Sequence, residues 1–381
     1  MKLPPLSLYV HIPWCVRKCP YCDFNSHAVR SEELPEREYV DALLADLDSE
    51  LDAAAGRPLQ SIFIGGGTPS LFSARAIDRI LRGVNDRLAF VPDIEITLEA
   101  NPGTFERARF ADYRAAGVNR LSIGIQSFND AALKALGRIH CADEAIAAAD
   151  AARSLFPQLN LDLMHGLPGQ TPAEALADLQ QAIALAPDHL SWYQLTIEPN
   201  TEFHARPPRL PMDESLWEIQ ERGQARLAEA GFRQYEVSAY SRPDCQARHN
   251  LNYWQFGDYI GIGAGAHGKL TRIGDTGLEI IRRHKMRQPA GYMDPARRLA
   301  GEEPVAPEER PFEFMLNALR LTDGVDLRLL SERAAVDICD IRTIIDLALS
   351  KGLLEDSDSR LVPSTLGRLF LNDLLALFLD G

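Results

Sequence analysis

Three of the six cysteines stand close together near the start of the chain, where their thiols could bind metal. Cys15, Cys19 and Cys22 follow the spacing C-x3-C-x2-C. The other three lie singly along the chain, at Cys141, Cys245 and Cys339. Clustered thiols in a chain too poor in cysteine for a disulfide framework are typical of a metal site.

Two kinds of metal site use such thiols. A structural zinc ion normally takes four ligands, and His11 or His27 could supply the fourth, although neither gives a usual zinc spacing. An iron–sulfur cubane also normally takes four cysteines. Three cysteines leave one iron of a cubane open to an exchangeable ligand, which the cluster could then reduce. The spacing favours such a cluster, with zinc or three unrelated thiols as the alternatives.

The loop that carries these thiols follows a short strand, because apolar residues alternate with polar or aromatic ones from Leu6 to Ile12, before Pro13. Five more strand-like runs follow, each separated by a helical stretch: SIFIGGG, IEITLEA, RLSIGIQ, LNLDLMH and HLSWYQL. Six strand–helix repeats without hairpin signals favour a parallel sheet with outer helices. We expect an α/β fold with a partial (βα)6 TIM-like barrel within residues 1–235. A full eight-fold barrel would need more repeats.

Sites in such folds gather at the carboxyl ends of the strands. The glycine run Gly65–Gly67 ends one strand and permits close approach of the backbone to a ligand. Polar residues end or interrupt the next strands, at Glu99, Gln126 and Asp162. Each alone could be an ordinary strand-end cap. Together they predict a polar ring that faces the thiol loop.

With Tyr21 before its third cysteine, the thiol motif resembles that of the radical SAM superfamily. The resemblance implies a [4Fe–4S] cluster held by Cys15, Cys19 and Cys22. It also implies that the open iron is chelated by S-adenosylmethionine (SAM), which can be cleaved to a deoxyadenosyl radical. In that chemistry the protein orients and shields the cofactor.

Further motifs, HIPWC, GGGTPS, EANPG, SIGIQSF, LGRIH and DLMHGLPGQ, resemble the HemN-like oxygen-independent coproporphyrinogen III oxidases from about Tyr9 to the C-terminus. The resemblance implies that two sets of residues contact SAM. Those for the cluster-bound SAM are Tyr9, Gly66, Gly67, Thr68 and Glu99. Those matching a second SAM in the oxidase are Tyr21, Gln126, Arg138 and Asp162.

Two departures separate the chain from that oxidase. Phe24 stands where the oxidase pattern C-x3-C-x2-C-x-C has a fourth cysteine, and only about eight residues precede Tyr9. In addition, the segment His249–Trp254 reads HNLNYW and is similar to the H-N-x-x-Y-W motif of the HemW-type haem chaperones. This sister branch implies a protein that binds haem and transfers it to an acceptor protein, without coproporphyrinogen dehydrogenase activity. Whether the chain is an enzyme stays open, and the oxidase is the alternative.

The residues of HNLNYW suit a porphyrin. Histidine is a common axial ligand of haem iron, which makes His249 the candidate ligand. Tyr253 and Trp254 offer flat apolar faces with polar edges. On the residues alone, a loop histidine beside core aromatics is the competing interpretation, and the resemblance favours haem. Cys245 and His267 are weaker candidates for this region.

The last third of the chain is expected to be separate. Residues 236–305 read as the haem-motif segment followed by a linker with little core over 270–310. Residues 306–381 predict a mostly helical, winged-helix-like domain, with helices at 312–321 and 337–349 and a short strand at 360–362. Acidic residues stand where a wing would approach phosphate, so nucleic-acid binding is not expected. The final segment, LFLNDLLALFL, either covers its own domain's core or contacts a membrane surface.

Composition excludes several classes. The 381 residues carry 40 Lys and Arg against 54 Asp and Glu, a net charge of −14, with 46% apolar residues. This balance is that of a soluble globular protein and opposes non-specific nucleic-acid binding. No apolar run is long enough to span a membrane, and the prolines of MKLPPLSLYV do not suit a signal peptide. We expect a cytoplasmic protein with reduced thiols whose partners are haem, an acceptor and an electron donor. Its oligomeric state is left open.

Overall fold

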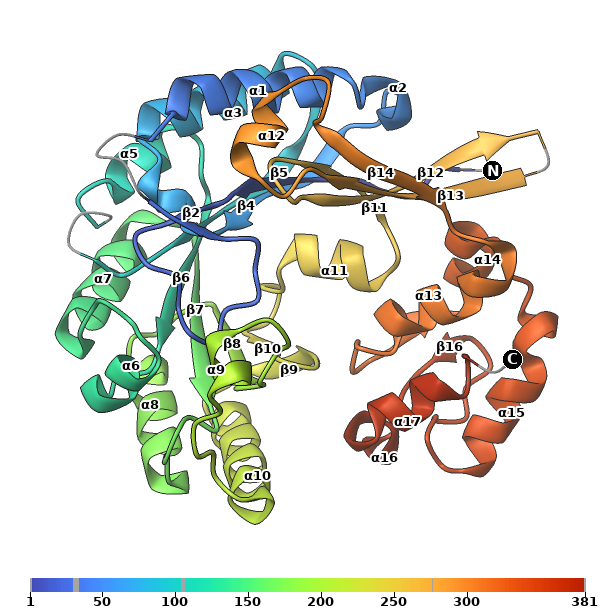
Figure 1. The fold of residues 1–381 in the computed structure, drawn as a ribbon. Coiled ribbons are helices and arrows are strands. Elements are labelled where there is room, and N and C mark those ends of the chain that lie inside the picture. The colour runs from blue at the N-terminus through green and yellow to red at the C-terminus, as the bar shows by residue number, and fades with distance from the viewer. Residues whose placement is uncertain (1, 30–33, 104–106, 276, 380–381) are drawn as a thin grey trace.

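The computed structural model describes residues 2–29, 34–103, 107–275 and 277–379. Its centre is a twelve-stranded sheet, curved into a partial barrel, in the order β14-β13-β12-β11-β1-β4-β5-β6-β7-β8-β10-β9 (Figure 1). The six expected parallel strands are all present and adjacent. They are β1 (Leu6–Ile12), β4 (Leu59–Gly66), β5 (Phe90–Ala100), β6 (Arg120–Gln126), β7 (Gln158–His165) and β8 (His189–Gln194).

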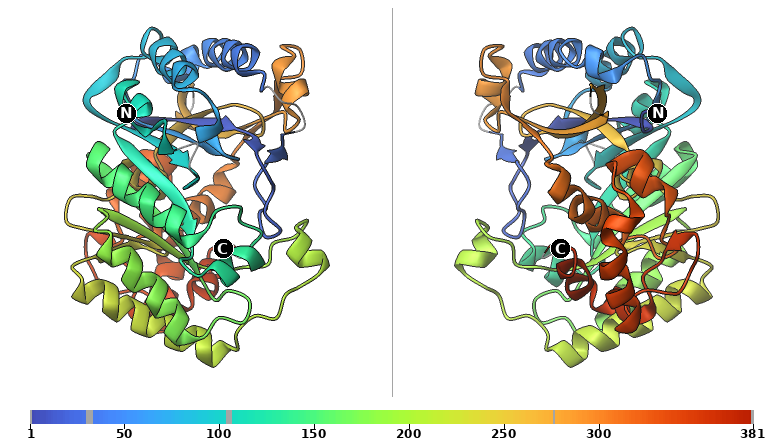
Figure 2. Two further views of the ribbon diagram at one scale, coloured as in Figure 1. Left: turned by 90° about the vertical axis from the view of Figure 1, so that its left-hand side faces the viewer. Right: turned by 90° about the vertical axis from the view of Figure 1, so that its right-hand side faces the viewer.

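Helices cover the convex face of this sheet, and the core lies between the two layers (Figures 1 and 2). The main ones are α1 (Glu36–Asp48), α3 (Ala74–Asn85), α7 (Ala142–Leu155), α8 (Pro172–Ala184) and α10 (Asp213–Glu229). Their starts follow local chemistry. The Ser73 side chain caps α3, and Thr171 forms a reciprocal capping box with Glu174 at α8. These helices confirm the α/β expectation.

The sheet continues where we expected a linker. β11 (Asp258–Ile262) pairs in parallel with β1, and β12 (His267–Gly274), β13 (Gly277–Lys285) and β14 (Leu299–Pro304) extend it in antiparallel order. On the other edge, β10 (Ala239–Ser241) and β9 (Arg233–Glu236) follow β8. The expectation of a coreless linker over 270–310 was therefore wrong. Charged residues made this segment look exposed, but Lys285 is buried against Asp46 of α1 and Glu50, which follows that helix.

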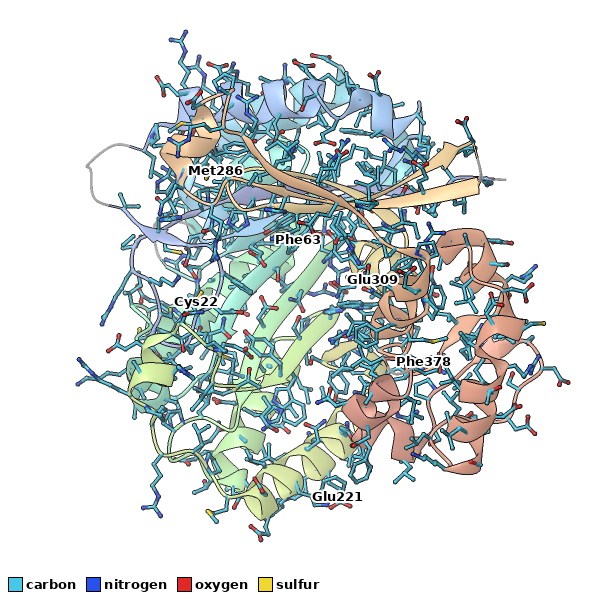
Figure 3. All side chains as sticks on the ribbon, turned by 45° about the vertical axis from the view of Figure 1, so that its right-hand side comes forward. Cys22, Phe63, Glu221, Met286, Glu309 and Phe378 are labelled. Carbon is cyan, nitrogen blue, oxygen red and sulfur yellow. The ribbon has the colours of Figure 1, made fainter. Side chains whose placement is uncertain are left out.

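The short helix α11 (Arg248–Trp254) carries the HNLNYW motif and lies on the concave side of the barrel, against β4 and β1. The ring of His249 stacks on Phe63 of β4, with 4.4 Å between the ring centroids. Figure 3 shows Phe63 in the interior of the molecule, beneath the sheet. The motif is thus an inner wall of the barrel.

The last part of the chain forms a mostly helical unit with its own apolar core. It comprises α13 (Arg310–Ala318), β15 (Val325–Asp326), α14 (Arg328–Ala334), α15 (Arg342–Ser350), β16 (Arg360–Leu361), α16 (Thr365–Leu369) and α17 (Leu371–Ala376). The final apolar segment places Leu374 and Phe378 in that core. Among the described residues, no helix is both long and apolar enough to cross a membrane.

Candidate functional site

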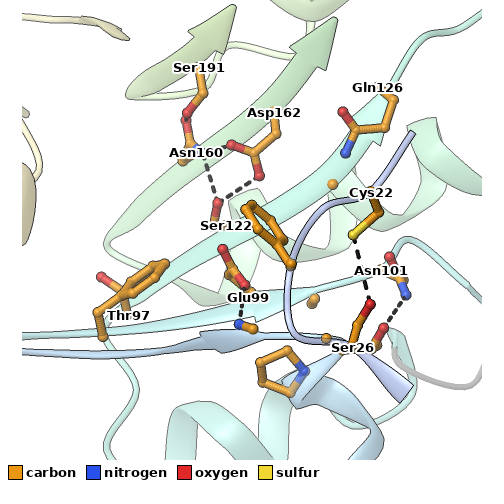
Figure 4. A pocket seen from close by; sticks show the side chains of 18 of the residues that line it. Cys22, Ser26, Thr97, Glu99, Asn101, Ser122, Gln126, Asn160, Asp162 and Ser191 are labelled. Carbon is orange, nitrogen blue, oxygen red and sulfur yellow. Dashed lines mark hydrogen bonds between the residues drawn. The ribbon is translucent and has the colours of Figure 1, made fainter. Parts of the chain in front are cut away.

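A cavity of about 510 Å³ occupies the concave side of the barrel. Its volume falls within the range of small-molecule sites, roughly 300–1,000 Å³. The thiol loop and residues of the parallel strands form one end of the cavity (Figure 4), and α11 borders the other. The two motifs singled out in the sequence therefore face a single cavity.

All three clustered cysteines line this cavity as free thiols. Cys15 belongs to the short strand β2 (Trp14–Cys15), which pairs with β3 (His27–Ala28) and fixes the base of the loop. Burial raises the pKa of the Cys15 and Cys22 thiols. Cys19 Sγ lies 3.7 Å from Arg138 Nη1. A positive charge thus stands beside one of the three sulfurs.

The donor set fits a cubane better than a single ion. In the described part of the chain, no three His, Cys, Asp or Glu side chains are grouped so as to hold one metal ion. A cubane binds each thiolate on a different iron atom, so its ligands stand further apart than those of a tetrahedral zinc. Phe24 also lines the cavity, and it offers no fourth thiolate.

The glycine run serves close packing inside the chain as well as access to the cavity. Gly66 adopts a φ of +119°, and a Cβ built there would lie 2.7 Å from the ring of His11. A Cβ on Gly67 would lie 2.6 Å from the carbonyl oxygen of Trp14. Any side chain here would push β4 away from the thiol loop. Gly66, Gly67 and Thr68 all line the cavity.

Two partly buried carboxyl groups face the thiol loop from β5 and β7. Glu99 accepts a hydrogen bond from the Gly66 amide at 3.0 Å, and Asp162 accepts bonds from Ser122 and Asn160 at 2.9 and 2.8 Å (Figure 4). Burial, with a smaller effect of the Asp162 charge, raises the pKa of Glu99 to about 8. Burial also raises the pKa of Asp162. Glu99 has no ion-pair partner among the described residues, so a cationic ligand could pair with its carboxylate and favour the ionised form.

Gln126 and Arg138 complete this end of the cavity. Gln126 ends β6 with a φ of +70°, an unusual conformation for a residue with a side chain. This turn lets its Oε1 accept a hydrogen bond from the Tyr193 hydroxyl at 2.9 Å. Arg138 donates through Nη2 to Asn101 Oδ1 and to the Gly124 carbonyl, at 2.8 and 2.7 Å. This end of the cavity therefore offers carboxyl groups, a guanidinium and an amide, which suit the ammonium, carboxylate and sulfonium groups of SAM.

At the other end of the cavity, His249 is fixed by Glu95. Its Nδ1 lies 2.7 Å from Glu95 Oε1. Burial acts to raise the pKa of Glu95, but the hydrogen bond and charge of His249 and the charge of Arg120 outweigh it and lower that pKa to about 2. An ionised carboxylate only accepts hydrogen bonds, so Nδ1 carries the proton. In the neutral ring, Nε2 then has the lone pair that a metal ligand needs.

Of the other residues considered for haem binding, only one lines the cavity. Trp254 lines the cavity together with His249. Tyr253 does not, and packs instead on Tyr259 with 4.7 Å between ring centroids. Cys245 does not line the cavity either, and its sulfur accepts a hydrogen bond from Gln158 at 3.7 Å. His267 is exposed and stacks on His284.

Comparison with known proteins gives two matching family descriptions, the radical SAM superfamily over residues 9–182 and the HemN C-terminal domain over residues 305–370. A protein named heme chaperone HemW from Escherichia coli (strain K12) is 53% identical over 382 residues, covering 100% of this chain and 99% of the relative. The protein of the same name from Haemophilus influenzae is 53% identical, covering 99% of both chains. This chain belongs to the HemW family.

The fold of this HemW family member also matches a solved structure. Coproporphyrinogen III oxidase (HemN) from Escherichia coli superimposes with a TM-score of 0.82 at 23% identity, covering 99% of this chain and 90% of that one. At this identity the likeness establishes the fold. The barrel and the helical C-terminal unit are thus those of a HemN-like radical SAM protein.

The structure brings most predicted site residues together, and it adds others. Of the residues matched to SAM, Tyr9 is the exception: its hydroxyl bonds His11 Nδ1 at 2.7 Å and its ring stacks on Phe63, behind the cavity wall. Residues that the sequence argument missed also line the cavity, namely Thr97, Asn101, Arg120, Ser122, Asn160, His189, Ser191 and Tyr193. Alternate residues of a strand face one side, so counting back by two from Glu99, Gln126 and Asp162 would have found four of them, Thr97, Arg120, Ser122 and Asn160.

Proposed function

We propose that this chain binds haem and passes it to an acceptor protein. The observation that supports this proposal is that His249, in a segment that resembles the H-N-x-x-Y-W motif of haem chaperones, lines a ligand-sized cavity while its Nδ1 is held by Glu95. Histidine held in this way is the usual arrangement for a metal-ligating imidazole. Trp254 supplies an aromatic face on the same wall.

The same cavity is proposed to hold a [4Fe–4S] cluster on Cys15, Cys19 and Cys22, with SAM as an exchangeable ligand of the open iron. When bound, this pair can supply one-electron reduction and radical chemistry. The chain's own part is to orient and shield. Glu99 accepts from the cationic groups of SAM, Arg138 places positive charge beside Cys19, and Gln126 and Asp162 form the facing wall.

Haem titration followed by absorbance tests the axial ligand. His249→Ala should weaken haem binding and leave iron and sulfide content unchanged. His267→Ala is the matched control, because His267 is exposed and stands away from the cavity. Equal haem affinity in the His249 variant and the wild type would refute the ligand role.

The cluster has a separate test. Cys19→Ala should abolish the brown absorbance after anaerobic reconstitution, whereas Cys339→Ala, on an exposed thiol, should not. Unchanged iron and sulfide in the Cys19 variant, or zinc in place of iron in the wild type, would overturn the cluster assignment.

The alternative function is oxidative decarboxylation of coproporphyrinogen III. Its support is that Glu99, Arg138 and Asp162 line one cavity, as the resemblance to the oxidase implies. Anaerobic incubation with SAM, a reductant and coproporphyrinogen III distinguishes the two. Release of carbon dioxide would establish the oxidase, and haem binding without it supports the chaperone. We further propose a cytoplasmic location, an electron donor and a protein acceptor for the haem.

A further inference from the structure

Four side chains that line the cavity each carry a buried polar atom without a hydrogen-bond partner among the described residues. The atoms are Thr97 Oγ1, Arg120 Nη2, Arg138 Nε and Trp254 Nε1. Unpaired buried polar groups are rare in folded proteins because they lose their hydration without compensation. Arg138 belongs to the thiol end, beside Cys19. The other three stand outside the set of residues assigned to the cluster and SAM.

Thr97 and Arg120 are neighbours by strand register. They are direct partners in the parallel pair β5–β6, so their side chains lie side by side on one face of the sheet. Thr97 and Arg120 are 1% and 2% exposed. In Figure 4, Thr97 lies at the end of the drawn pocket away from Cys22 and Asn101.

The guanidinium of Arg120 is held by contacts of one terminal nitrogen, while the other has no partner among the described residues. Its Nη1 donates to Gln158 Oε1 at 3.2 Å and to the Cys245 carbonyl at 3.3 Å, and it lies 3.7 Å from Glu95 Oε2. Nη2 has none of these partners. Since Glu95 also binds His249 Nδ1, the free Nη2 belongs to the haem end of the cavity.

The three unpaired groups have the same chemical preference. Guanidinium Nη2 and indole Nε1 only donate hydrogen bonds, and the threonine hydroxyl can donate. One carries a full positive charge in a buried setting, where charge-assisted hydrogen bonds are strongest. Such a set recognises an oxyanion, and a guanidinium matches a planar carboxylate.

We propose that Arg120, Thr97 and Trp254 form a carboxylate subsite that receives a propionate group of the bound tetrapyrrole. This inference rests on the proposed haem function and adds the chemical group by which the ligand is recognised. Haem carries two such carboxylates at its edge. The subsite would fix which edge enters the barrel beside His249.

Metal-free protoporphyrin IX and its dimethyl ester test the subsite without axial ligation. The wild type, with its cluster reconstituted, should bind the diacid at least about tenfold more tightly than the diester, as expected for a buried charge-assisted hydrogen bond. Arg120→Gln should lower diacid affinity to the diester level and leave diester affinity unchanged. Fluorescence titration measures all four combinations.

Two further variants keep the test independent of folding. Thr97→Val is isosteric, leaves the ion pair with Glu95 intact and should lower diacid affinity by a few-fold. Arg120→Lys retains the charge and should keep part of the preference for the diacid. Iron content and melting temperature of each variant should match the wild type.

The outcomes separate this inference from the proposed function. Equal binding of diacid and diester by the wild type would overturn the subsite while His249 could still bind haem iron. Unchanged haem affinity in His249→Ala would refute the axial ligand while the ester comparison could still support the subsite. A third outcome is loss of SAM affinity in Arg120→Gln with diacid binding intact. That would assign the subsite to the carboxylate of SAM and overturn the proposal.

Discussion

Two groups of carboxylates, one buried and one partly buried, have opposite surroundings in this chain. Asp46 of α1 and Glu50, two residues beyond that helix, contact Lys285 of β13, whose Nζ lies 2.6 Å from a carboxylate oxygen of each. Glu50 is also paired with Arg283. Glu99 of β5 is only partly buried and lines the cavity, and its side chain accepts a hydrogen bond from the Gly66 amide. Burial raises the pKa of Asp46 and of Glu99, but only Asp46 has a lysine that acts against this rise.

The difference separates structural from ligand-binding charge. A buried carboxylate that the chain neutralises itself joins two elements, here α1 and the β13 edge of the sheet. A buried carboxylate left without a cation disfavours its own charged form until a cationic ligand arrives. Position agrees with this division, because Glu99 lines the cavity and Asp46 does not.

The largest expected effect is a loss of folding stability when the Asp46–Glu50–Lys285 network loses its lysine. Lys285→Met should lower the free energy of unfolding by about 3–5 kcal/mol, because it leaves Asp46 buried without its cation. Chemical denaturation measures the loss. Lys351→Met, on an exposed lysine, is the matched control and should change little. A stability loss below about 1 kcal/mol in the Lys285 variant would contradict the structural role given to this network.

The next effect is on the unpaired group. Glu99→Gln keeps the shape of the side chain and removes the charge, so folding stability should hold while SAM affinity falls about 10- to 100-fold. Isothermal titration of the reconstituted protein with SAM checks this. If the variant unfolds like Lys285→Met, or binds SAM as the wild type does, the contrast between the two groups fails.

The sequence predicted each of these regions to a different extent. The six parallel strands and the thiol loop could be predicted, since apolar runs and the spacing of Cys15, Cys19 and Cys22 are local signals. The β13 edge could not. Lys285 and Arg283 look exposed in the sequence, because their partners Asp46 and Glu50 lie more than 200 residues earlier in the chain.

The same limit applies to the haem end of the cavity. The HNLNYW motif was visible, but not that α11 lies inside the barrel, because the contact of His249 with Glu95 joins residues 154 positions apart. Arg120 and Ser122 could have been predicted as cavity residues, because they lie on the same face of their strand as Gln126. Domain limits at 235 and 305 stay predictions.

A smaller effect concerns pH. Because the pKa of Glu99 is about 8 in the ligand-free fold, above its ordinary 4.5, the protonated form stabilises the fold. That contribution is complete below about pH 4.5 and is lost as pH rises through about 8. A cationic ligand needs the ionised form, so SAM affinity should rise between pH 7 and 8, by less than about tenfold. Glu99→Gln should show no such rise, and a rise of equal size in that variant would assign the titration to another group.

The smallest expected effect tests whether the contribution of the Lys285 network to the free energy of unfolding comes from its burial rather than from ion pairing alone. Arg222 and Glu218 form an ion pair one turn apart on α10, with both side chains about half exposed. Solvent screens such a pair, so Arg222→Ala should change the free energy of unfolding by only about 0.3–0.5 kcal/mol. The same denaturation series measures it beside Lys285→Met. If the two variants lose similar stability, the network's effect does not come from desolvated charge, and Glu99 could no longer be distinguished as a ligand-binding group by its lack of a cation.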